Sequence, residues 1–559
     1  MQKIWRVKDC DPGIQDHLSS ALNISRITAQ LLANRGVRTA DLASDFLKCS
    51  LASCHSPFLL KDMDKAVSRI KKAISKAERI LIYGDYDVDG MTSVTVLYLA
   101  LRNLGAKCET YIPNRIEEGY GLNGAAIKKA YRDGVTLIIT VDCGITSFKE
   151  VSEAAALKID VIITDHHEIL NSRIPAAYAV INPLQSDCKY PFKHLAGVGL
   201  AYKLVKALYE GTQHFAEDFL DLVSLGTVAD IAPLVGENRI LAKHGLDELN
   251  RRERVGLKAL MDVANLDGNI SSSTIGFVLG PRINAMGRIG SPQKAIDLLL
   301  SNDIDVAMDL AKVLSAENRN RQKIEAKILE EALSKVEREV NFKHHKVIVL
   351  ASENWHPGVI GIVASRIADK FYRPTILISL DGKLGKGSGR SIEHFHLFEY
   401  LLRCKDLLAG FGGHESACGI TIEKEKISEF TELINSEAFK DADERIFSPK
   451  LDIEMDVPLS TLSEDVIREI ETLAPFGPDN PRPILSSRNV YIKDGPRQIG
   501  KSGFKFWVTD KGVTCEAVTF GRGNLEMPKA GTGVDLAYIP SINNWQGVQS
   551  IQLELKDIK

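Results

Sequence analysis

Hydrophobic and polar positions alternate in regular blocks between about residues 65 and 185. Short apolar runs, of which Ile80–Ile82, Thr136–Val141 and Asp160–Thr164 are the clearest, are separated by segments with a helical pattern such as Met91–Leu104. Bounded runs of this length predict buried strands. Because strand and helix patterns take turns, this part of the chain is expected to fold as a parallel α/β sheet.

Three of these predicted strands end in residues that can bind a metal. The first is followed by Asp85, Asp87 and Asp89, the second by Asp142, and the third by Asp165-His166-His167-Glu168. In an open parallel sheet the carboxyl ends of the strands lie at the same edge. If the three strands are parallel neighbours, these aspartates and His166 therefore meet at one rim.

Such a rim of like charges is costly unless a cation neutralises it. Carboxylates with one or two imidazoles suit manganese, magnesium, iron or zinc better than copper or a thiolate site. Solvated aspartates also cap helices and fill turns. That interpretation suits any one of them but does not explain three acidic strand ends together, so the pattern predicts a two-metal hydrolytic centre.

Further polar candidates stand in apolar or turn-forming surroundings. Asp230 follows the apolar run Leu222–Ala229, where an unpaired carboxylate is expensive. A metal satisfies it, and so does a helix cap with buried hydrogen bonds. Gly280–Arg288 places two arginines and an amide among turn formers, which suits phosphate binding and is also usual for solvated turns. Arg115, in a polar loop, is a weaker candidate of the same kind.

Apolar spacing from Asp303 to about Val340 predicts long connecting helices, with the charged run Glu317–Arg321 on a solvated face. A second α/β unit follows, with strands at Lys346–Leu350 and Pro374–Leu380. Residues 1–60 contain only short helical candidates without recognisable chemistry.

Two glycine-rich stretches, Gly385–Ser391 and Gly410–Ala417, lie in this second unit. Glycines let backbone amides approach a phosphate closely, and the neighbouring basic residues add charge. A single stretch of this kind is usually just a turn. Two of them beside His356 and His414 favour a substrate cleft.

Beyond about residue 450 the pattern predicts several short strands with Gly, Pro and Asn turns, which suggests a small β-barrel. One part of it, Lys501 and Phe504–Trp507, mixes basic and aromatic side chains as single-strand-binding barrels do. Aromatic residues in strands more often belong to the core, so both interpretations stay open.

Composition limits these expectations without changing them. The 559 residues allow three or four domains, and 44% hydrophobic with 26% charged residues is typical of a soluble globular protein. The net charge of −3 gives no global basic field, although a local basic groove remains compatible with it. Nine scattered cysteines without a C-x-x-C pair argue against a zinc ribbon and fit a reducing cytoplasm. Neither a signal peptide nor a membrane span is expected.

Several separated motifs together carry a family resemblance. In chain order they are Asp85–Gly90, Val141–Gly144, Asp165–Glu168, Ala229-Asp230, Pro281–Ala285, Trp355–Gly358 and Gly412–His414. The chain resembles the DHH phosphoesterase family in these motifs, and within it the exonucleases of single-stranded DNA. The resemblance covers nearly everything after residue 60. It implies 5′-to-3′ degradation with Mn²⁺ or Mg²⁺ at a two-metal site, in DNA repair and recombination.

The resemblance also implies an architecture and a set of site residues. Residues 1–60 form an N-terminal segment, 61–300 a DHH catalytic domain, 301–342 connecting helices, 343–445 a DHH-associated domain and 446–559 an OB-like barrel. The implied metal ligands are Asp85, Asp87, Asp89, Asp142, His166 and Asp230, with Asp142 bridging and catalytic. His167 is the implied catalytic contact to the scissile phosphate, and the implied substrate contacts are Arg282, Asn284, His356, Arg390 and His414.

One position departs from the family pattern. Small-substrate members carry a metal-binding His four residues before the first Asp of an Asp-x-Asp pair. Here Tyr83 or Leu81 stands there, depending on the pair that is matched. Asp85 is the candidate for the missing contact.

Two other functions compete with an exonuclease. A hydrolase of short oligonucleotides or cyclic dinucleotides would use the same centre, but the extra barrel and the missing histidine argue against it. A non-catalytic DNA-binding scaffold would have lost ligands that are present here. Single-stranded DNA is the expected partner, with a single-strand-binding protein and a helicase as further candidates. No membrane partner is expected, and the expected state is a monomer.

Overall fold

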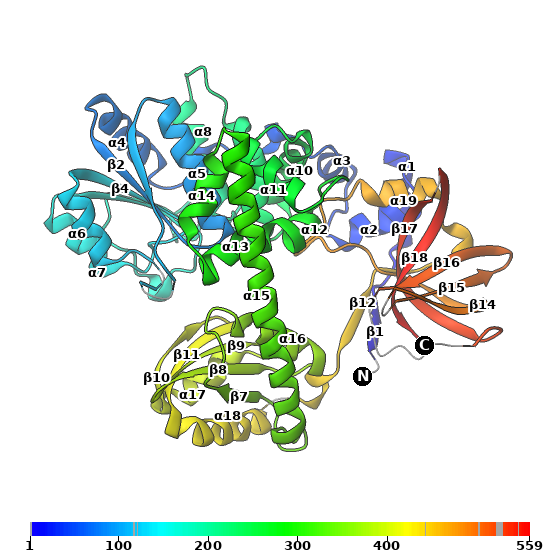
Figure 1. Ribbon diagram of the computed structural model, residues 1–559. Coiled ribbons are helices and arrows are strands. Elements are labelled where there is room, and N and C mark those ends of the chain that lie inside the picture. The colour runs from blue at the N-terminus through cyan, green and yellow to red at the C-terminus, as the bar shows by residue number, and fades with distance from the viewer. Residues whose placement is uncertain are drawn as a thin grey trace. The chain divides into compact units, whose positions relative to one another are not determined.

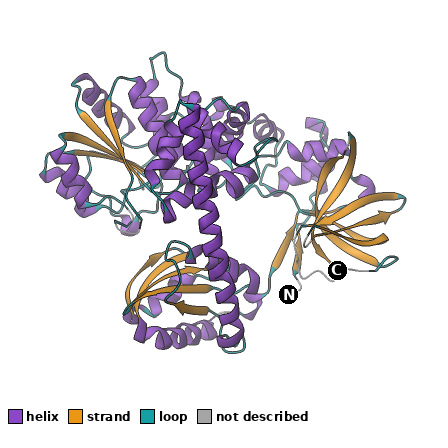
Figure 2. Cartoon of the chain, viewed as in Figure 1, coloured by secondary structure: helices purple, strands orange, loops and turns teal. Residues whose placement is uncertain are grey.

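The computed structural model describes residues 3–115, 118–119, 121–441, 443–500, 503–520, 529–545 and 547–559. The chain forms two compact units. One contains Met1–Arg6 and Ala316–Leu451, and the other contains Val7–Ser315 and Asp452–Lys559. Figure 1 follows the chain through both, and Figure 2 separates helices from strands. Within the described ranges, none of the helices combines the length and the apolarity needed to cross a bilayer.

The larger unit is built around a five-stranded sheet in the order β3-β2-β4-β5-β6. Every neighbouring pair is parallel, which confirms the expected parallel sheet. β2, β4 and β5 are adjacent, so their carboxyl ends share one edge. The bounds are β2 Arg79–Gly84, β3 Lys107–Tyr111, β4 Val135–Val141, β5 Asp160–Thr164 and β6 Ala179–Ile181.

Helices cover both faces of this sheet (Figure 1). Alternate side chains of a strand point to opposite faces. Ile80 and Ile82 accordingly pack with α4 Met63–Ser75, α5 Val88–Asn103 and α8 Gly197–Tyr209, whereas Leu81 and Tyr83 pack with α6 Gly124–Arg132 and α7 Phe148–Ala156. The sheet is thus held between two separate hydrophobic layers.

A helical region follows the sheet. It comprises α9 Leu220–Ala229, α10 Gly236–Arg251, α11 Val255–Val263, α12 Ser272–Thr274, a π-helical turn Ile275–Leu279, α13 Gly280–Ile289 and α14 Pro292–Leu300. The expectation of a turn over Gly280–Arg288 is wrong, because these residues form α13. Pro281 is tolerated in the first helical turn. A Cβ on Gly287 would lie 1.9 Å from the carbonyl oxygen of Tyr86, so this glycine serves close packing.

The N-terminal helices and the C-terminal barrel share one hydrophobic core. Strands β14, β15, β16, β18 and β17 pair in succession, and β14 also pairs with β17, which closes the predicted barrel. Leu18, Leu31 and Ala43 pack in the same cluster as barrel residues such as Phe506. The bounds are β1 Ile4–Val7, α1 Pro12–Leu22, α2 Arg26–Asn34, α3 Ala40–Lys48, β12 Lys450–Ile453, β13 Met455–Asp456, α19 Glu464–Glu471, β14 Leu485–Ile499, β15 Gly503–Asp510, β16 Val513–Thr519, β17 Gly533–Trp545 and β18 Val548–Ile558.

The aromatic residues of Phe504–Trp507 in the barrel were expected either to bind a single strand or to belong to the core. Phe506 is buried in the core, while the neighbouring Trp507 is 39% exposed. Lys501 lies outside the described residues. Phe506 is therefore a core aromatic residue, and Trp507 remains available to a ligand.

The smaller unit has a five-stranded sheet in the order β10-β11-β9-β8-β7. The predicted glycine loop Gly385–Ser391 is instead mostly strand β9, and much of Gly410–Ala417 is strand β10. A Cβ on Gly387 would lie 2.5 Å from Ile420, so the glycines make room for packing on the sheet. The bounds are β7 Ile348–Ser352, α16 Ile360–Phe371, β8 Thr375–Asp381, β9 Leu384–Arg390, α17 Leu397–Arg403, β10 Leu408–Gly413, β11 Ala417–Glu423 and α18 Ile427–Asp441.

The expected connecting helices form one long helix, α15 Ile304–Glu339. The solvated face predicted over Glu317–Arg321 is wrong in part. Asn318 and Arg321 are buried, and Arg321 pairs with buried Glu325 one turn further along. The charges compensate each other inside the smaller unit, which a spacing pattern alone does not reveal.

Candidate metal centre

The first three aspartates lie where β2 passes into α5. Asp85 directly follows the strand and is buried. Asp87 caps the helix, since its Oδ1 accepts a hydrogen bond from the backbone N–H of Gly90 at 3.1 Å. The helix begins at Val88, three residues before the predicted start, so Asp89 lies in its first turn rather than on a free loop. The helix fixes the direction of that carboxylate.

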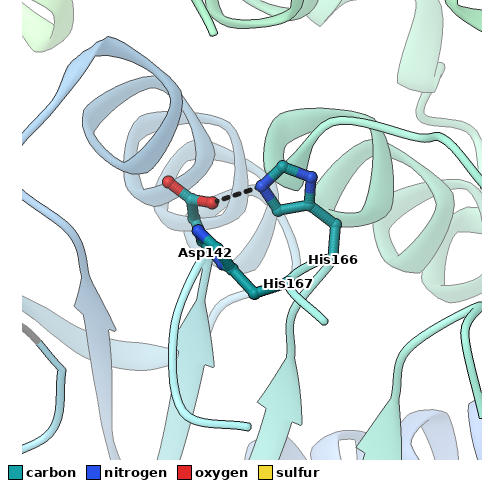
Figure 3. Close-up of side chains that lie close together, drawn as sticks. All are labelled: Asp142, His166 and His167. Carbon is teal, nitrogen blue, oxygen red and sulfur yellow. Dashed lines mark ion pairs between the residues drawn. The ribbon is translucent and has the colours of Figure 1, made fainter. Parts of the chain in front are cut away.

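Asp142 stands at the tip of β4 and faces His166 from the tip of β5 (Figure 3). Its backbone adopts a φ of 59°, in the left-handed region that non-glycine residues rarely occupy. Nε2 of His166 lies 3.1 Å from Oδ1 of Asp142, 3.9 Å from Oδ2 of Asp89 and 4.0 Å from Oδ2 of Asp230. Four of the predicted ligands are therefore gathered at one point.

The potential ligand atoms form overlapping groups in which all atoms lie within 4.8 Å of one another. One group is Asp85, Asp87 and Asp142, and another is Asp89, His166 and Asp230. The short contact of Asp142 with His166 joins the two. Oδ1 of Asp85 and Oδ1 of Asp142 are buried without a hydrogen-bond partner among the described residues. A third group, Asp142, His166 and His167, overlaps with both. The buried acceptor of Asp142, which belongs to two groups, and that of Asp85, which belongs to one, fit a pair of hard cations.

The electrostatics of the cluster also favour cations. Burial, followed by the charge of Asp87, raises the pKa of Asp89 to about 7. Burial and the charge of Asp89 raise the pKa of Asp230 to about 9, and burial and neighbouring aspartates also raise the pKa of Asp142. Burial lowers the pKa of His166 to about 4, so its imidazole is neutral at pH 7 and able to ligate a metal.

His167 has a different environment. Burial opposes its charge, but the carboxylate of Asp165 outweighs that effect and raises the pKa of His167 to about 9. Nδ1 of His167 lies 2.7 Å from Oδ1 of Asp165, and Oδ2 of Asp165 accepts a hydrogen bond from the backbone of Ile145 at 2.8 Å. Asp165 is thus an orienting residue that the sequence prediction did not assign. It keeps a positive imidazolium beside the ligand cluster.

The amino end of α8 donates backbone hydrogen bonds to the ligand cluster. The backbone N–H groups of Gly197 and Val198 each donate to the carboxylate of Asp89 at 2.7 Å. A helix amino end stabilises negative charge through these free N–H groups and its dipole. A Cβ on Gly197 would lie 2.7 Å from Asp142, so glycine is needed for the close approach.

A polar cavity of about 150 Å³ opens beside the ligands. Arg282, a predicted substrate contact, is not among its lining residues and instead donates to the carbonyl of Val278 and the hydroxyl of Ser315. Asn284, predicted for the same role, does line the cavity, and its Oδ1 accepts from the N–H of Val88 at 3.2 Å. The lining residues are Tyr86, Asp87, Val88, Asp89, Arg115, Ala229, Asp230, Asn284, Gly287 and Arg288.

Two of these lining residues, Arg115 and Arg288, were missed or undervalued from the sequence. Arg115 lies over the ring of Tyr86 at 5.0 Å, so it is held at the cavity by a cation–π contact rather than solvated in a loop. Arg288 shares the helix of Asn284. Spacing of four residues on one helix is the signal that could have paired Asn284 with Arg288.

The remaining predicted substrate contacts belong to the smaller unit. Arg390 at the end of β9 pairs with Ala417, whose carbonyl accepts from the N–H of His414 at 2.8 Å. His356 precedes α16, and a Cβ on Gly361 in that helix would lie 2.9 Å from the guanidinium of Arg390. Arg390, His414 and the start of α16 therefore gather at one end of this sheet.

Tyr83, at one of the two positions where other members carry a ligand histidine, does not point to the cluster. It is fully buried, and its hydroxyl donates to the carbonyl of Gly121 at 2.8 Å. Asp85, the candidate to replace the contact of that histidine, lies in one of the ligand groups.

Comparison with known proteins agrees with this geometry. The family model described as DHH family, N-terminal domain matches residues 79–227, the DHHA1 domain model matches 344–439, and the RecJ OB domain model matches 453–557. The fold and the acidic rim together define a protein of the DHH class.

Relatives narrow the class. The single-stranded-DNA-specific exonuclease RecJ of Escherichia coli is 36% identical over 95% of this chain and 95% of its own length, and that of Bacillus subtilis is 40% identical over 99% of this chain and 70% of its own. The chain belongs to the RecJ family. A crystal structure of RecJ from Thermus thermophilus in complex with Mn²⁺ has a TM-score of 0.86 at 30% identity, covering 100% of this chain and 79% of that one.

Proposed function

We propose that this protein is a metal-dependent exonuclease that hydrolyses the phosphodiester bonds of single-stranded DNA in the 5′-to-3′ direction, in DNA repair and recombination. The observation that carries the proposal is the double set of ligands around Asp142, in a chain that belongs to the RecJ family. RecJ structures with Mn²⁺ and with Mg²⁺ support these two cations as cofactors.

Asp85, Asp87, Asp89, Asp142, His166 and Asp230 would hold the two cations. When bound, these cations lower the pKa of a water molecule and neutralise charge on the reacting phosphate. Asp142, which belongs to two of the ligand groups and lies 3.1 Å from His166, would contribute to both sites. The amides of Gly197 and Val198 keep Asp89 fixed, so that the ligand geometry does not depend on the substrate.

His167 would act directly on the scissile phosphate. Asp165 holds the imidazolium at 2.7 Å, so His167 presents a positive N–H donor beside the ligand cluster, where it would donate to a phosphoryl oxygen. A fixed positive donor stabilises the charge that develops there. Arg115 and Arg288 at the cavity offer guanidinium donors to neighbouring phosphates, and Asn284 offers its amide.

The smaller unit would contribute through Arg390, His356 and His414. Glycine-lined strands, a helix amino end and a guanidinium gathered at one edge support binding of a phosphate or terminal nucleotide. For Arg282 we propose a supporting role in α13, because its described hydrogen bonds go to Val278 and Ser315.

The test uses single-stranded DNA labelled at its 5′ or its 3′ end, with Mn²⁺. Early release of the 5′ label, abolished by EDTA and by Asp142→Ala, is the expected result. Early release of the 3′ label would overturn the polarity. Activity confined to very short oligonucleotides would favour a small-substrate hydrolase instead, and binding without cleavage would favour a scaffold.

Finer properties rest on the family likeness alone. We propose a monomeric enzyme of the cytoplasm that works with a single-strand-binding protein and a helicase. The modules 1–60, 61–300, 301–342, 343–445 and 446–559 are likewise proposed, and limited proteolysis followed by mass spectrometry tests their boundaries. Size-exclusion chromatography tests the monomer, and pull-down with purified single-strand-binding protein tests that partner.

A further inference from the structure

Phe277 is an aromatic residue without a place in the hydrophobic core. Its side chain is 82% exposed, more than that of any other large hydrophobic residue described as exposed. It lies in the π-helical turn Ile275–Leu279, directly before α13. Pro281 has no N–H to donate to the carbonyl of Phe277, as a regular helix would require, and this loss accounts for the wider turn.

The position of Phe277 along the helix relates it to the metal centre. Asn284 and Arg288, which line the cavity, follow it by seven and eleven residues. The wider turn at Ile275–Leu279 changes the angular register, so Phe277 is placed by its distance along the helix and not by a shared face. Seven residues correspond to roughly 10 Å along an α-helix axis, so Phe277 lies about two turns before Asn284.

A second exposed apolar side chain directly follows a cavity-lining residue in the chain. Ile231 directly follows the predicted ligand Asp230 and is 71% exposed. Its φ is 62°, which is a strained conformation for a β-branched residue. The two segments are in contact, because a Cβ on Gly280 at the start of α13 would lie 3.3 Å from Ala229. The two segments that supply charged and polar groups to the cavity therefore each carry an exposed apolar side chain beyond its lining, Ile231 on one and Phe277 on the other.

We propose that Phe277, assisted by Ile231, is the positioning residue on which a nucleobase of the single strand stacks as the strand enters the metal centre. This inference rests on the proposed function and adds where the bases bind. Phosphates bind to guanidinium and amide groups inside the cavity, and the base outside it needs a flat apolar contact. Stacking on one ring is tolerant of base identity, so the contact suits degradation of any sequence.

The test compares Phe277→Ala and Phe277→Trp on a single-stranded oligonucleotide with Mn²⁺. Stacking energies measured by alanine substitution predict a rise in KM of about tenfold for Phe277→Ala, with kcat within about twofold, and recovery in Phe277→Trp. Phe215→Ala is the matched control, because Phe215 is also an exposed phenylalanine of this unit, 66% exposed, and lies outside the cavity lining.

A scan with single abasic residues near the 5′ end separates stacking from a structural effect. At the stacked position, an abasic residue should raise the KM of the parent enzyme by about tenfold and that of Phe277→Ala no further. An equal penalty of Phe277→Ala on intact and abasic strands at every position would overturn the proposal, as would an unchanged KM.

Binding in EDTA gives a readout independent of cleavage. A 2-aminopurine base at the stacked position should be quenched by the parent protein and by Phe277→Trp, but not by Phe277→Ala. Quenching that is unchanged in Phe277→Ala would contradict the stacking. If the parent protein quenches 2-aminopurine yet never releases a nucleotide, the exonuclease assignment fails while the base contact stands.

Discussion

Two clusters of buried charged residues in the larger unit differ in whether the protein supplies the opposite charge. In the first, the ammonium of Lys203 lies 2.7 Å from Glu237 and donates to the carbonyl of His55 at 2.9 Å, while the hydroxyl of Tyr190 donates to the same carboxylate. One positive and one negative charge cancel, and their remaining polar atoms are satisfied. This cluster is complete within the protein.

The metal centre is the opposite case. Asp89, Asp142 and Asp230 converge on a neutral His166. One oxygen each of Asp85 and Asp142 remains without a hydrogen-bond donor among the described residues. The comparison teaches that burial of charge is not itself the mark of a functional site. An excess of one sign that the protein leaves uncompensated is the better mark, because bound protons or a ligand must supply the opposite charge.

The sharpest way to test this contrast is Asp142→Asn. Hydrolysis of single-stranded DNA should fall by at least about 10³-fold, because a ligand common to both sites is lost. The metal-free protein should unfold at a higher temperature than the parent, because one buried negative charge has been removed. The measurements are kcat with Mn²⁺ and the melting temperature in EDTA. A variant with reduced metal-free stability would contradict the idea of an uncompensated cluster.

Lys203→Met should show the reverse behaviour. Breaking the paired cluster leaves Glu237 buried and uncompensated, so the free energy of unfolding should fall by about 3–5 kcal/mol. Activity per folded molecule should stay close to that of the parent, because the cluster holds no ligand. Urea denaturation and active-site titration separate the two quantities. An unchanged free energy of unfolding in Lys203→Met would show that the Lys203–Glu237 pair does not stabilise the fold.

Asp165→Asn tests the orienting role beside the cluster. Losing the carboxylate lowers the pKa of His167 from about 9, so less of the imidazolium is present at neutral pH. The expected loss is about 10²-fold in kcat, in the range of a misplaced acid–base group. The loss should be smaller at pH 6 than at pH 8, because low pH restores the charge. A pH-independent loss would assign Asp165 to folding alone.

The smallest expected effect is the pH dependence of stability without metal. Folding raises the pKa of Asp89 from 3.8 to about 7. The stabilisation from this group is therefore complete below about pH 4 and is lost as the pH rises through 7. Mn²⁺ binds the charged carboxylates, so the rise in melting temperature on adding Mn²⁺ should grow from pH 5 to pH 8. A constant rise would be inconsistent with protons competing for the site.

The sequence was sufficient to predict the acidic edge of the parallel sheet in the larger unit. Apolar runs that end in acidic residues define both the strands and the location of the ligands, because parallel strands bring their carboxyl ends together. The gathering of Asp142, His166 and Asp230, which are far apart in the chain, followed from that rule and from the family motifs.

Other features depend on contacts that no spacing rule contains. Gly280–Arg288 has the composition of a turn but is helical, and the close approach of Gly287 to Tyr86 shows that this glycine serves packing instead of a turn. The partner of His167 could not be chosen within Asp165-His166-His167-Glu168 until the direction of each side chain was known. The burial of Arg321 likewise depends on Glu325, since burying either alone would be prohibitive.

The core shared by the N-terminal helices and the C-terminal barrel has a consequence for biosynthesis. Leu18 and Leu31 leave the ribosome first, yet barrel partners such as Leu485 and Phe506 are more than 400 residues away. At the usual rate of translation the helices wait for about 20–80 s, which is far longer than a helix needs to form. Throughout that interval their apolar faces are open to chaperones. Nascent chains arrested before the barrel is made should therefore bind a holdase chaperone, and completed chains should release it.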